Sequence, residues 1–255
     1  MSTPFTVIIP ARYGSTRLPG KPLLALAGEP VIAHVWRRAR DSGAARVIVA
    51  TDDERIAETV TDMAGEVCLT RADHQSGTDR LAEVVARLDL PAEAIVVNLQ
   101  GDEPLMPPEL LKQVANMLAA EPRAAIATLA APVEDIDMLH DPHAVKLIAD
   151  AEGRALYFSR APIPWDREGA PAKQLQAARR HLGVYAYRAG FLQRYPTLPP
   201  SPLEALEQLE QLRALAAGEW IQVAEAAVEP GHGIDTAADL MTAEARIRAL
   251  TPPER

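Results

Sequence analysis

The chain has 255 residues, of which 48% are hydrophobic and 24% are charged, so it can bury a substantial core and is not disordered as a whole. Its formal net charge of −9 excludes the broad basic face of most nucleic-acid-binding proteins, although a local cleft can still attract an anion. Its single cysteine, Cys68, excludes an intrachain disulfide and a cysteine metal cluster.

The first half of the chain alternates short apolar runs with amphipathic stretches. Residues 6–9 are β-branched and are closed by Pro10, which predicts a buried strand. Further strands are predicted at 46–50, 66–69, 94–99 and 125–130. Helices are predicted at 31–39, from a cap at Asp52 or Asp53 to about 64, from the loop after residue 80 through 88, and at 108–120.

This alternation predicts an α/β fold with a mostly parallel mixed sheet and helices on both faces. Ligands bind such sheets beyond the carboxyl ends of the strands. Three polar loops, which follow Ile9, Leu69 and Leu99, would all emerge at that edge. The sequence therefore predicts that three separate stretches meet in one cleft. No linker or repeat interrupts residues 1–255, so we expect a single domain.

The second half of the chain is less regular. Strands are predicted at 145–148, 155–158, 181–187 and 222–228. The polar stretch 165–176 has no clear period and predicts a mobile loop, whereas regularly spaced leucines predict one helix over 203–215. Asp235 or Thr236 is expected to cap a last helix that ends near residue 250. The sequence contains neither a signal-like segment nor a long apolar run, so we expect a cytoplasmic protein without membrane insertion.

The stretch 8–22 reverses the charge of the chain locally, because it holds three cations and no acid. These are Arg12, Arg17 and Lys21, set among glycine and small hydroxyl residues. Glycine lets a loop backbone approach a ligand closely, and successive backbone N–H groups can form an anion-binding concavity. The stretch therefore predicts a phosphate-binding loop.

Asp102 follows the most apolar predicted strand, and Asp235 lies in a glycine-rich turn. A carboxylate just beyond a parallel strand suits Mg²⁺, which takes one or two carboxylates together with phosphate oxygens. Alone, Asp102 could cap a turn and Asp235 could cap a helix. As a pair they could complete a metal site.

Several common motifs are absent from the sequence. Lys21 is followed by Pro22 rather than by serine or threonine, so the loop is not a P-loop, and no Gly-x-Gly-x-x-Gly dinucleotide fingerprint occurs. There is no Gly-x-Ser-x-Gly elbow of a serine hydrolase, and the histidines lack zinc-ligand spacing.

Nearly the whole chain resembles the 3-deoxy-manno-octulosonate cytidylyltransferases, or CMP-Kdo synthetases. The first motif, Ile-Pro-Ala-Arg-Tyr at 9–13 with Ser-Thr-Arg-Leu-Pro-Gly-Lys at 15–21, is typical of sugar nucleotidyltransferases in general. The later motifs make the resemblance specific. They are Thr-Arg-Ala-Asp-His-Gln-Ser-Gly-Thr at 70–78, Asn-Leu-Gln-Gly-Asp-Glu-Pro at 98–104, Tyr-Phe-Ser-Arg-Ala at 157–161, Arg-His-Leu-Gly at 180–183 and Pro-Leu-Glu through Leu-Glu-Gln-Leu-Arg at 202–213.

The resemblance implies a nucleotide-diphospho-sugar transferase-like fold, and an enzyme that transfers CMP from CTP to the sugar acid Kdo for lipopolysaccharide synthesis. It also implies Mg²⁺ and a homodimer. Lys21, Arg12, Asp102 and Asp235 would be catalytic, and the two aspartates would bind the metal. The implied nucleotide-binding residues are Pro10, Ala11, Arg12, Arg17, Lys21, Ser76, Arg80 and Gln100. The implied sugar-binding residues are Gln100, Arg160, His181, Tyr185 and Glu210.

Three alternatives remain open at this point. A cytidylyltransferase for a related acidic sugar, such as 8-amino Kdo or a sialic acid, would share the fold and the loop, but Arg160, His181 and Glu210 favour Kdo. A catalytically silent nucleotide-binding regulator should have lost Lys21 or a carboxylate ligand, and both are present. A dinucleotide-dependent oxidoreductase shares the layer architecture but requires the missing glycine fingerprint.

Overall fold

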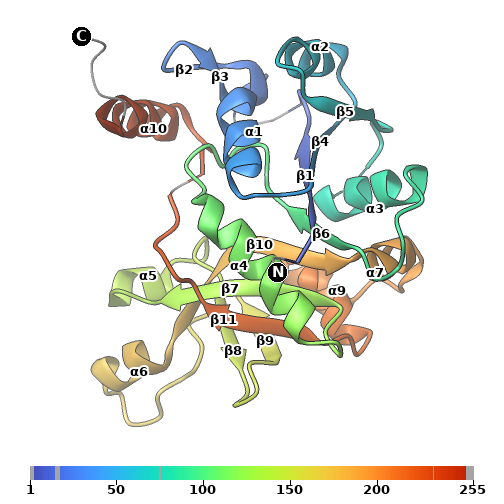
Figure 1. Cartoon of the computed structure of the whole chain (residues 1–255). Helices are drawn as coiled ribbons and strands as arrows, with labels where there is room; N and C mark the ends of the chain where they lie inside the picture. The colour runs from blue at the N-terminus through green and yellow to red at the C-terminus, as the bar shows by residue number, and fades with distance from the viewer. Residues whose placement is uncertain (1–2, 15–17, 75, 232, 251–255) are drawn as a thin grey trace.

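A computed structural model describes residues 3–14, 18–74, 76–231 and 233–250 (Figure 1). Within these residues a nine-stranded sheet has the order β11-β7-β10-β6-β1-β4-β5, and β8 pairs with both β10 and β9. Its strands are β1 Thr6–Ala11, β4 Arg46–Thr51, β5 Glu66–Leu69, β6 Ile95–Asn98, β7 Ile126–Pro132, β8 Lys146–Ala149, β9 Ala155–Ser159, β10 Arg179–Arg188 and β11 Ile221–Glu225. The short strands β2 Ala25–Leu26 and β3 Glu29–Pro30 form a separate hairpin.

The described helices connect these strands, and most of them pack against the sheet (Figure 1). They are α1 Val31–Asp41, α2 Glu54–Asp62, α3 Gly77–Arg87, α4 Pro108–Ala120, α5 Ile136–His140, α6 Pro171–Ala177, α7 Ala189–Arg194, α8 Pro202–Glu207, α9 Gln211–Ala216 and α10 Ala237–Leu250, with 3-10 turns η1 Lys21–Leu23 and η2 Tyr195–Thr197. None of the helices in this part of the chain is long and apolar enough to cross a bilayer.

The sheet is mixed and mostly parallel, as the sequence predicts. Strands β6, β1, β4 and β5 are parallel neighbours, and β7 pairs in parallel with β11. Only β10 on the main path runs against both of its neighbours, β6 and β7. Insertion of this one antiparallel strand joins the two parallel groups into a continuous sheet.

Helices cover both faces of the sheet because successive side chains of a strand point to opposite faces. In β1, Val7 and Ile9 pack in a core cluster with residues of α1, α2, α4 and α10. Ile8, which lies between them, packs in a second cluster with residues of α3, α7 and α9. The continuous apolar run in β1 therefore reflects burial on both faces.

Two helix caps left open by the sequence are now assigned. Asp53 caps α2, because its carboxylate accepts the N–H of Arg55 at 3.0 Å. Thr236 caps α10, because its hydroxyl accepts the N–H of Asp239 at 3.2 Å while the Asp239 carboxylate accepts the N–H of Thr236. This reciprocal pair is a capping box. It leaves the side chain of Asp235 directed toward Lys21.

The predicted single helix over 203–215 is wrong. The chain forms α8 and α9, separated by Gln208 in the left-handed region at φ 53°. The guanidinium of Arg160 donates a hydrogen bond to the carbonyl of Glu207 at 2.7 Å. A tertiary contact thus satisfies a helix-end carbonyl and stabilises the break, which leucine spacing cannot reveal.

The mobile loop predicted over 165–176 is also wrong in its second half, where α6 begins at Pro171. Asp166 organises the preceding turn, because its carboxylate accepts the backbone N–H groups of Glu168 and Ala170. Proline is well tolerated in the first turn of a helix, and aspartate favours turns because its side chain accepts hydrogen bonds from nearby backbone N–H groups. Both features stabilise this segment.

Candidate active site

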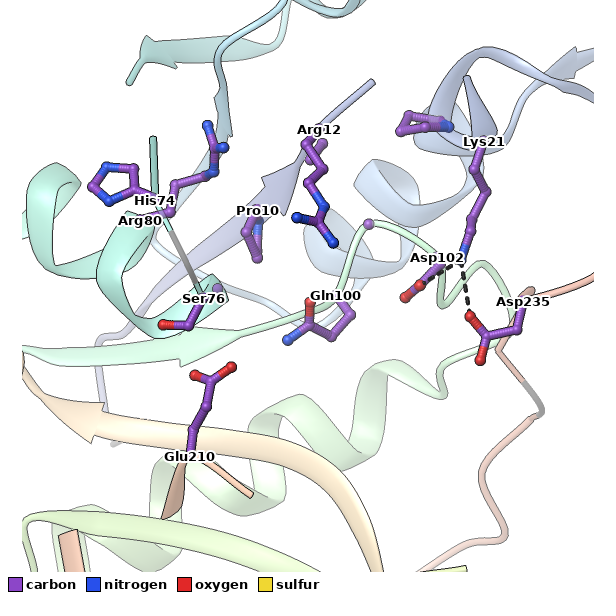
Figure 2. A pocket seen from close by; sticks show the side chains of 14 residues that line it. Pro10, Arg12, Lys21, His74, Ser76, Arg80, Gln100, Asp102, Glu210 and Asp235 are labelled. Atoms are coloured by element: carbon purple, nitrogen blue, oxygen red, sulfur yellow. Dashed lines mark hydrogen bonds and ion pairs between the residues drawn. The ribbon is translucent and has the colours of Figure 1, made fainter. Parts of the chain in front are cut away.

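The three predicted loops meet in one cavity of about 290 Å³ at the carboxyl ends of β1, β5 and β6 (Figure 2). Predicted nucleotide-binding residues from all three loops line it: Pro10, Ala11, Arg12, Lys21, Ser76, Arg80 and Gln100. The two predicted metal ligands, Asp102 and Asp235, also line it. Arg17 lies outside the described residues. The convergence inferred from strand order is therefore confirmed.

Two glycines bring these loops together. A Cβ on Gly101 would lie 2.9 Å from the carbonyl oxygen of Pro10, so only glycine lets the loop after β6 pass so close to the end of β1. Gly20 adopts the left-handed conformation at φ 69° and donates its N–H to the carbonyl of Tyr13 at 3.1 Å. This hydrogen bond closes the base of the predicted phosphate-binding loop.

Lys21 is the electrostatic centre of the cavity. Its Nζ lies 2.8 Å from Oδ2 of Asp102 and 3.1 Å from Oδ1 of Asp235 (Figure 2). Burial alone would lower the pKa of Lys21, but the charges and hydrogen bonds of the two aspartates outweigh burial and raise it above its usual value. Lys21 is therefore an ammonium at neutral pH, poised next to the cavity with Arg12.

The opposite wall of the cavity is built on the start of α3. The hydroxyl of Ser76 accepts the N–H of Asp79 at 3.0 Å and so caps the helix. Arg80 is buried, donates to the hydroxyl of Thr70 and pairs with Asp52 at 3.3 Å. A helix N-terminus favours anions, so this wall and the Lys21 side are both suited to phosphate or to another anionic group.

Glu103 lies beside the aspartate pair and was not singled out by the sequence. Its Oε2 is buried and has no hydrogen-bond partner among the described residues. Burial, together with repulsion by Asp102 and Asp235, raises the pKa of Glu103 to about 8. The folded protein therefore keeps Glu103 protonated at neutral pH. Its only sequence signal is its place next to Asp102.

Glu103→Gln should stabilise the protein at pH 8 but leave its stability near pH 4 almost unchanged. Below the unfolded pKa of 4.5 the carboxyl is protonated in both states. As pH rises toward 8, only the unfolded state ionises, so the wild type progressively loses stability. One pKa unit is worth about 1.4 kcal/mol, so a pKa raised from 4.5 to about 8 predicts a gain of several kcal/mol at pH 8.

Urea unfolding at both pH values measures this effect, with Glu109→Gln on the exposed first turn of α4 as the matched control. Parallel stability curves for wild type and Glu103→Gln across this pH range would contradict the assignment.

A second cavity of about 160 Å³ adjoins the first, and both are lined by Gln100 and Glu210. Tyr185, another predicted sugar-binding residue, also lines the second cavity. Three buried polar atoms of its lining residues have no hydrogen-bond partner in the described part of the chain: Oδ1 of Asn98, the hydroxyl of Tyr195 and Nε2 of Gln211. Buried polar groups are normally paired, so this wall is suited to a polar, hydroxyl-rich ligand.

Glu210 joins the two cavities because it reaches from the start of α9 to α3. Its Oε2 accepts the hydroxyl of Thr78, and the N–H of Thr78 lies 3.4 Å away. Figure 2 shows its carboxylate directed toward the cavity that Ser76 and Gln100 line. The sequence predicted Glu210 as a sugar-binding residue but could not show that it borders both cavities.

Arg160 and His181, the other predicted sugar-binding residues, are absent from the described lining of both cavities. The Arg160 guanidinium donates to backbone carbonyls, including that of Pro142 at 2.8 Å. Burial lowers the pKa of His181 to about 3, so the ring is neutral. Because the Thr128 hydroxyl donates to the carbonyl of Val184, it accepts the Nε2–H of His181 at 2.9 Å. Sugar binding by Arg160 and His181 stays a prediction.

Asp102 and Asp235 fit a magnesium ion that is shared with a nucleotide. Both carboxylates already converge on one cation, the Lys21 ammonium. Among the described residues no group of three or more metal-ligating side chains is assembled, so the protein does not offer a complete cage. A pair of carboxylates is nevertheless the usual protein share of a Mg²⁺ site that substrate phosphates complete.

The chain is similar to known cytidylyltransferases over nearly its full length. Residues 6–221 match a family model described as "Cytidylyltransferase". Proteins named 3-deoxy-manno-octulosonate cytidylyltransferase from Halorhodospira halophila and Chromohalobacter salexigens are 60% and 58% identical, over 98% and 96% of this chain and 99% and 95% of their own.

Solved structures agree with this similarity. A CMP:2-keto-3-deoxy-manno-octonic acid synthetase complexed with CTP is 41% identical, with a TM-score of 0.89 over 98% of this chain and all of that one. A cytidylyltransferase from Leptospira borgpetersenii, at 17% identity and a TM-score of 0.64 over 97% of this chain and 88% of its own, shows likeness of fold alone. The shared fold, the loop cavity and these identities together place this chain in the family of the 3-deoxy-manno-octulosonate cytidylyltransferases.

Proposed function

We propose that the protein transfers CMP from CTP to 3-deoxy-D-manno-octulosonate (Kdo), giving CMP-Kdo and pyrophosphate for lipopolysaccharide biosynthesis. The observation that carries this proposal is the shared wall of the two cavities. One cavity has Arg12, Lys21 and the start of α3, which suit a triphosphate. The other is uncharged and rich in hydroxyl and amide groups, apart from Glu210. Gln100 and Glu210 border both, so two such ligands would be held side by side.

The proposed reaction is an in-line displacement at phosphorus. The anomeric hydroxyl oxygen of the sugar forms a bond to the α-phosphorus of CTP, the bond from that phosphorus to the bridging oxygen of the β-phosphate breaks, and pyrophosphate leaves. The hydroxyl proton passes to solvent or to a phosphate oxygen. Such chemistry depends on positioning and charge neutralisation. Arg12 and Lys21 would neutralise charge on the leaving pyrophosphate.

We also propose that Asp102 and Asp235 hold Mg²⁺ together with CTP. Bound there, the ion would polarise the α-phosphate and reduce repulsion between the phosphates and the two carboxylates. Lys21, which contacts both carboxylates, would then be able to turn its ammonium toward the phosphates.

We further propose a homodimer in the cytoplasm. The resemblance to the family first suggested this assembly. Several large apolar side chains in the second half of the described chain are exposed, as is expected where a monomer has an unpaired contact surface: Leu156, Trp165, Leu203 and Leu206.

A substrate panel tests the proposed function. With CTP and Mg²⁺, we expect pyrophosphate release to be fastest with Kdo and much slower with 8-amino Kdo or a sialic acid. ATP, GTP and UTP in place of CTP are the matched nucleotide controls. The relatives at 58–60% identity bear the name of the Kdo enzyme, which favours this choice over the related acidic sugars. If pyrophosphate release is faster with another sugar acid, that sugar acid rather than Kdo is the substrate.

A further inference from the structure

The segment that carries Asp235 is packed against the turn that carries Asp102, with no room for a side chain at two positions. A Cβ on Gly231 would lie 2.4 Å from Cβ of Leu105 and 2.9 Å from its carbonyl oxygen. A Cβ on Gly233 would lie 2.7 Å from Oε1 of Glu103. Neither glycine has a left-handed φ, so space rather than backbone torsion requires glycine here.

Ile234, between these glycines and Asp235, anchors the same segment twice. Its side chain is fully buried in the core cluster that also contains Met106 and residues of α4. Its N–H donates to the carbonyl of Asp102 at 2.8 Å. The backbone immediately before one carboxylate is therefore hydrogen-bonded to the residue that carries the other carboxylate.

The remaining support for Asp235 comes from its other side. The N–H of Asp235 donates to the carboxylate of Asp239 at 3.0 Å, within the cap of α10. The backbone at Asp235 is thus held on both sides, by the hydrogen bond from Ile234 to the Asp102 carbonyl and by the hydrogen bond from Asp235 to the start of a 14-residue helix. Figure 2 shows the result, with the carboxylates of Asp102 and Asp235 both directed at the Lys21 ammonium from different segments.

We propose that Gly231, Gly233 and Ile234 are positioning residues that fix the separation of the Asp102 and Asp235 carboxylates, and that they thereby set how strongly a divalent cation strengthens CTP binding. This inference rests on the proposed function, because it takes the aspartate pair as the metal ligands. An added methyl group at Gly231 meets the Cβ and the carbonyl oxygen of Leu105, neither of which can move aside without the backbone, so the segment must lift and carry Asp235 away. At Gly233 the methyl group meets Oε1 of the Glu103 side chain, which lies beside Asp102, so we expect a smaller displacement of Asp235 and a partial loss of the Mn²⁺ enhancement.

This difference between the two glycines makes a sharp test. We compare CTP affinity in the presence of Mn²⁺ with CTP affinity in EDTA, by calorimetry, for the wild type and each variant. Supporting contacts around metal ligands typically contribute about 10–100-fold in metal affinity. Gly231→Ala should reduce the Mn²⁺ enhancement of CTP binding by that factor of about 10–100, while affinity in EDTA does not fall. A general loss of structure would lower both affinities.

Glu103→Ala provides the rescue. It removes the atom that a methyl group at Gly233 would meet, but leaves Leu105 in place. The double variant Gly233→Ala/Glu103→Ala should therefore show the same Mn²⁺ enhancement of CTP binding as Glu103→Ala alone. The loss in Gly231→Ala should persist in the same background. Glu229→Ala, on the exposed part of the same connection, should behave as wild type.

The outcomes separate this inference from the proposed function. If the wild type shows no Mn²⁺ enhancement, the metal role of the aspartates fails and the inference falls with it. If the wild type is enhanced and Gly231→Ala keeps that enhancement, only the positioning inference is overturned. Should Gly231→Ala fail to fold, Gly233→Ala and its rescue decide the question, and absence of rescue counts against the proposal.

Discussion

Lys21→Ala should lower kcat/KM for CTP by about 10²–10³-fold, the range found when one preorganised donor to a developing anion is removed. The side chain of Lys21 is only 10% exposed and touches both carboxylates of the cavity. Its removal takes away a cation from the proposed phosphate site and, with it, the positive charge that Asp102 and Asp235 share. The variant should therefore repel the triphosphate as well as lose stabilisation of the leaving pyrophosphate.

Steady-state kinetics with CTP and Kdo measure this loss, and thermal unfolding confirms that the variant is folded. Lys173→Ala is the matched control, since it makes the same charge change at a side chain that is 71% exposed and pairs with Glu168. Wild-type rates for Lys21→Ala would refute the phosphate role of Lys21.

Asp102→Asn should sharply lower both the activity and its dependence on Mg²⁺. The substitution keeps the size of the side chain but removes the charge, so the aspartate pair no longer offers two anionic oxygens to a hard cation. We expect kcat to fall by about 10²–10³-fold at wild-type Mg²⁺ concentrations, because this kind of catalysis depends mainly on neutralising the charge that develops in the transition state. Wild-type enzyme in EDTA should be equally inactive.

A Mg²⁺ titration of activity tests this expectation, with Asp62→Asn at the exposed end of α2 as the control. Full wild-type activity in EDTA would show that the proposed metal role is wrong. If Asp102→Asn instead reaches half of its activity at the same Mg²⁺ concentration as the wild type, the metal is bound by other ligands.

Local patterns predicted the regular parts of the fold well. The helix over 108–120 has the predicted bounds, and the strand at 66–69 is likewise unchanged. The helix lies where apolar periodicity agrees with the burial that the fold imposes. Prediction failed where a side chain distant in sequence determines the backbone conformation. At Gln208, for example, a hydrogen bond from Arg160 helps to end α8.

The candidate site shows the same division. Its charged members stand out in the sequence because polar residues follow buried strands, as Arg12 and Asp102 do. The second cavity was only partly predicted, because Asn98 and Tyr195 look like ordinary residues of a strand and of a 3-10 turn. They can be recognised as candidate ligand-binding residues only in the structure. There they line a cavity, and each has a buried polar atom without a hydrogen-bond partner among the described residues.

The sequence by itself determined the mixed α/β sheet, the basic loop and the resemblance to the CMP-Kdo synthetases, because each can be recognised from local patterns of residues and their order along the chain. Only the tertiary structure decided that Lys21 lies between Asp102 and Asp235, although these residues are 81 and 214 positions away from it. Long-range packing also set the demand for glycine at positions 231 and 233. Such distances depend on how whole elements pack in space, and no local pattern of side chains specifies them.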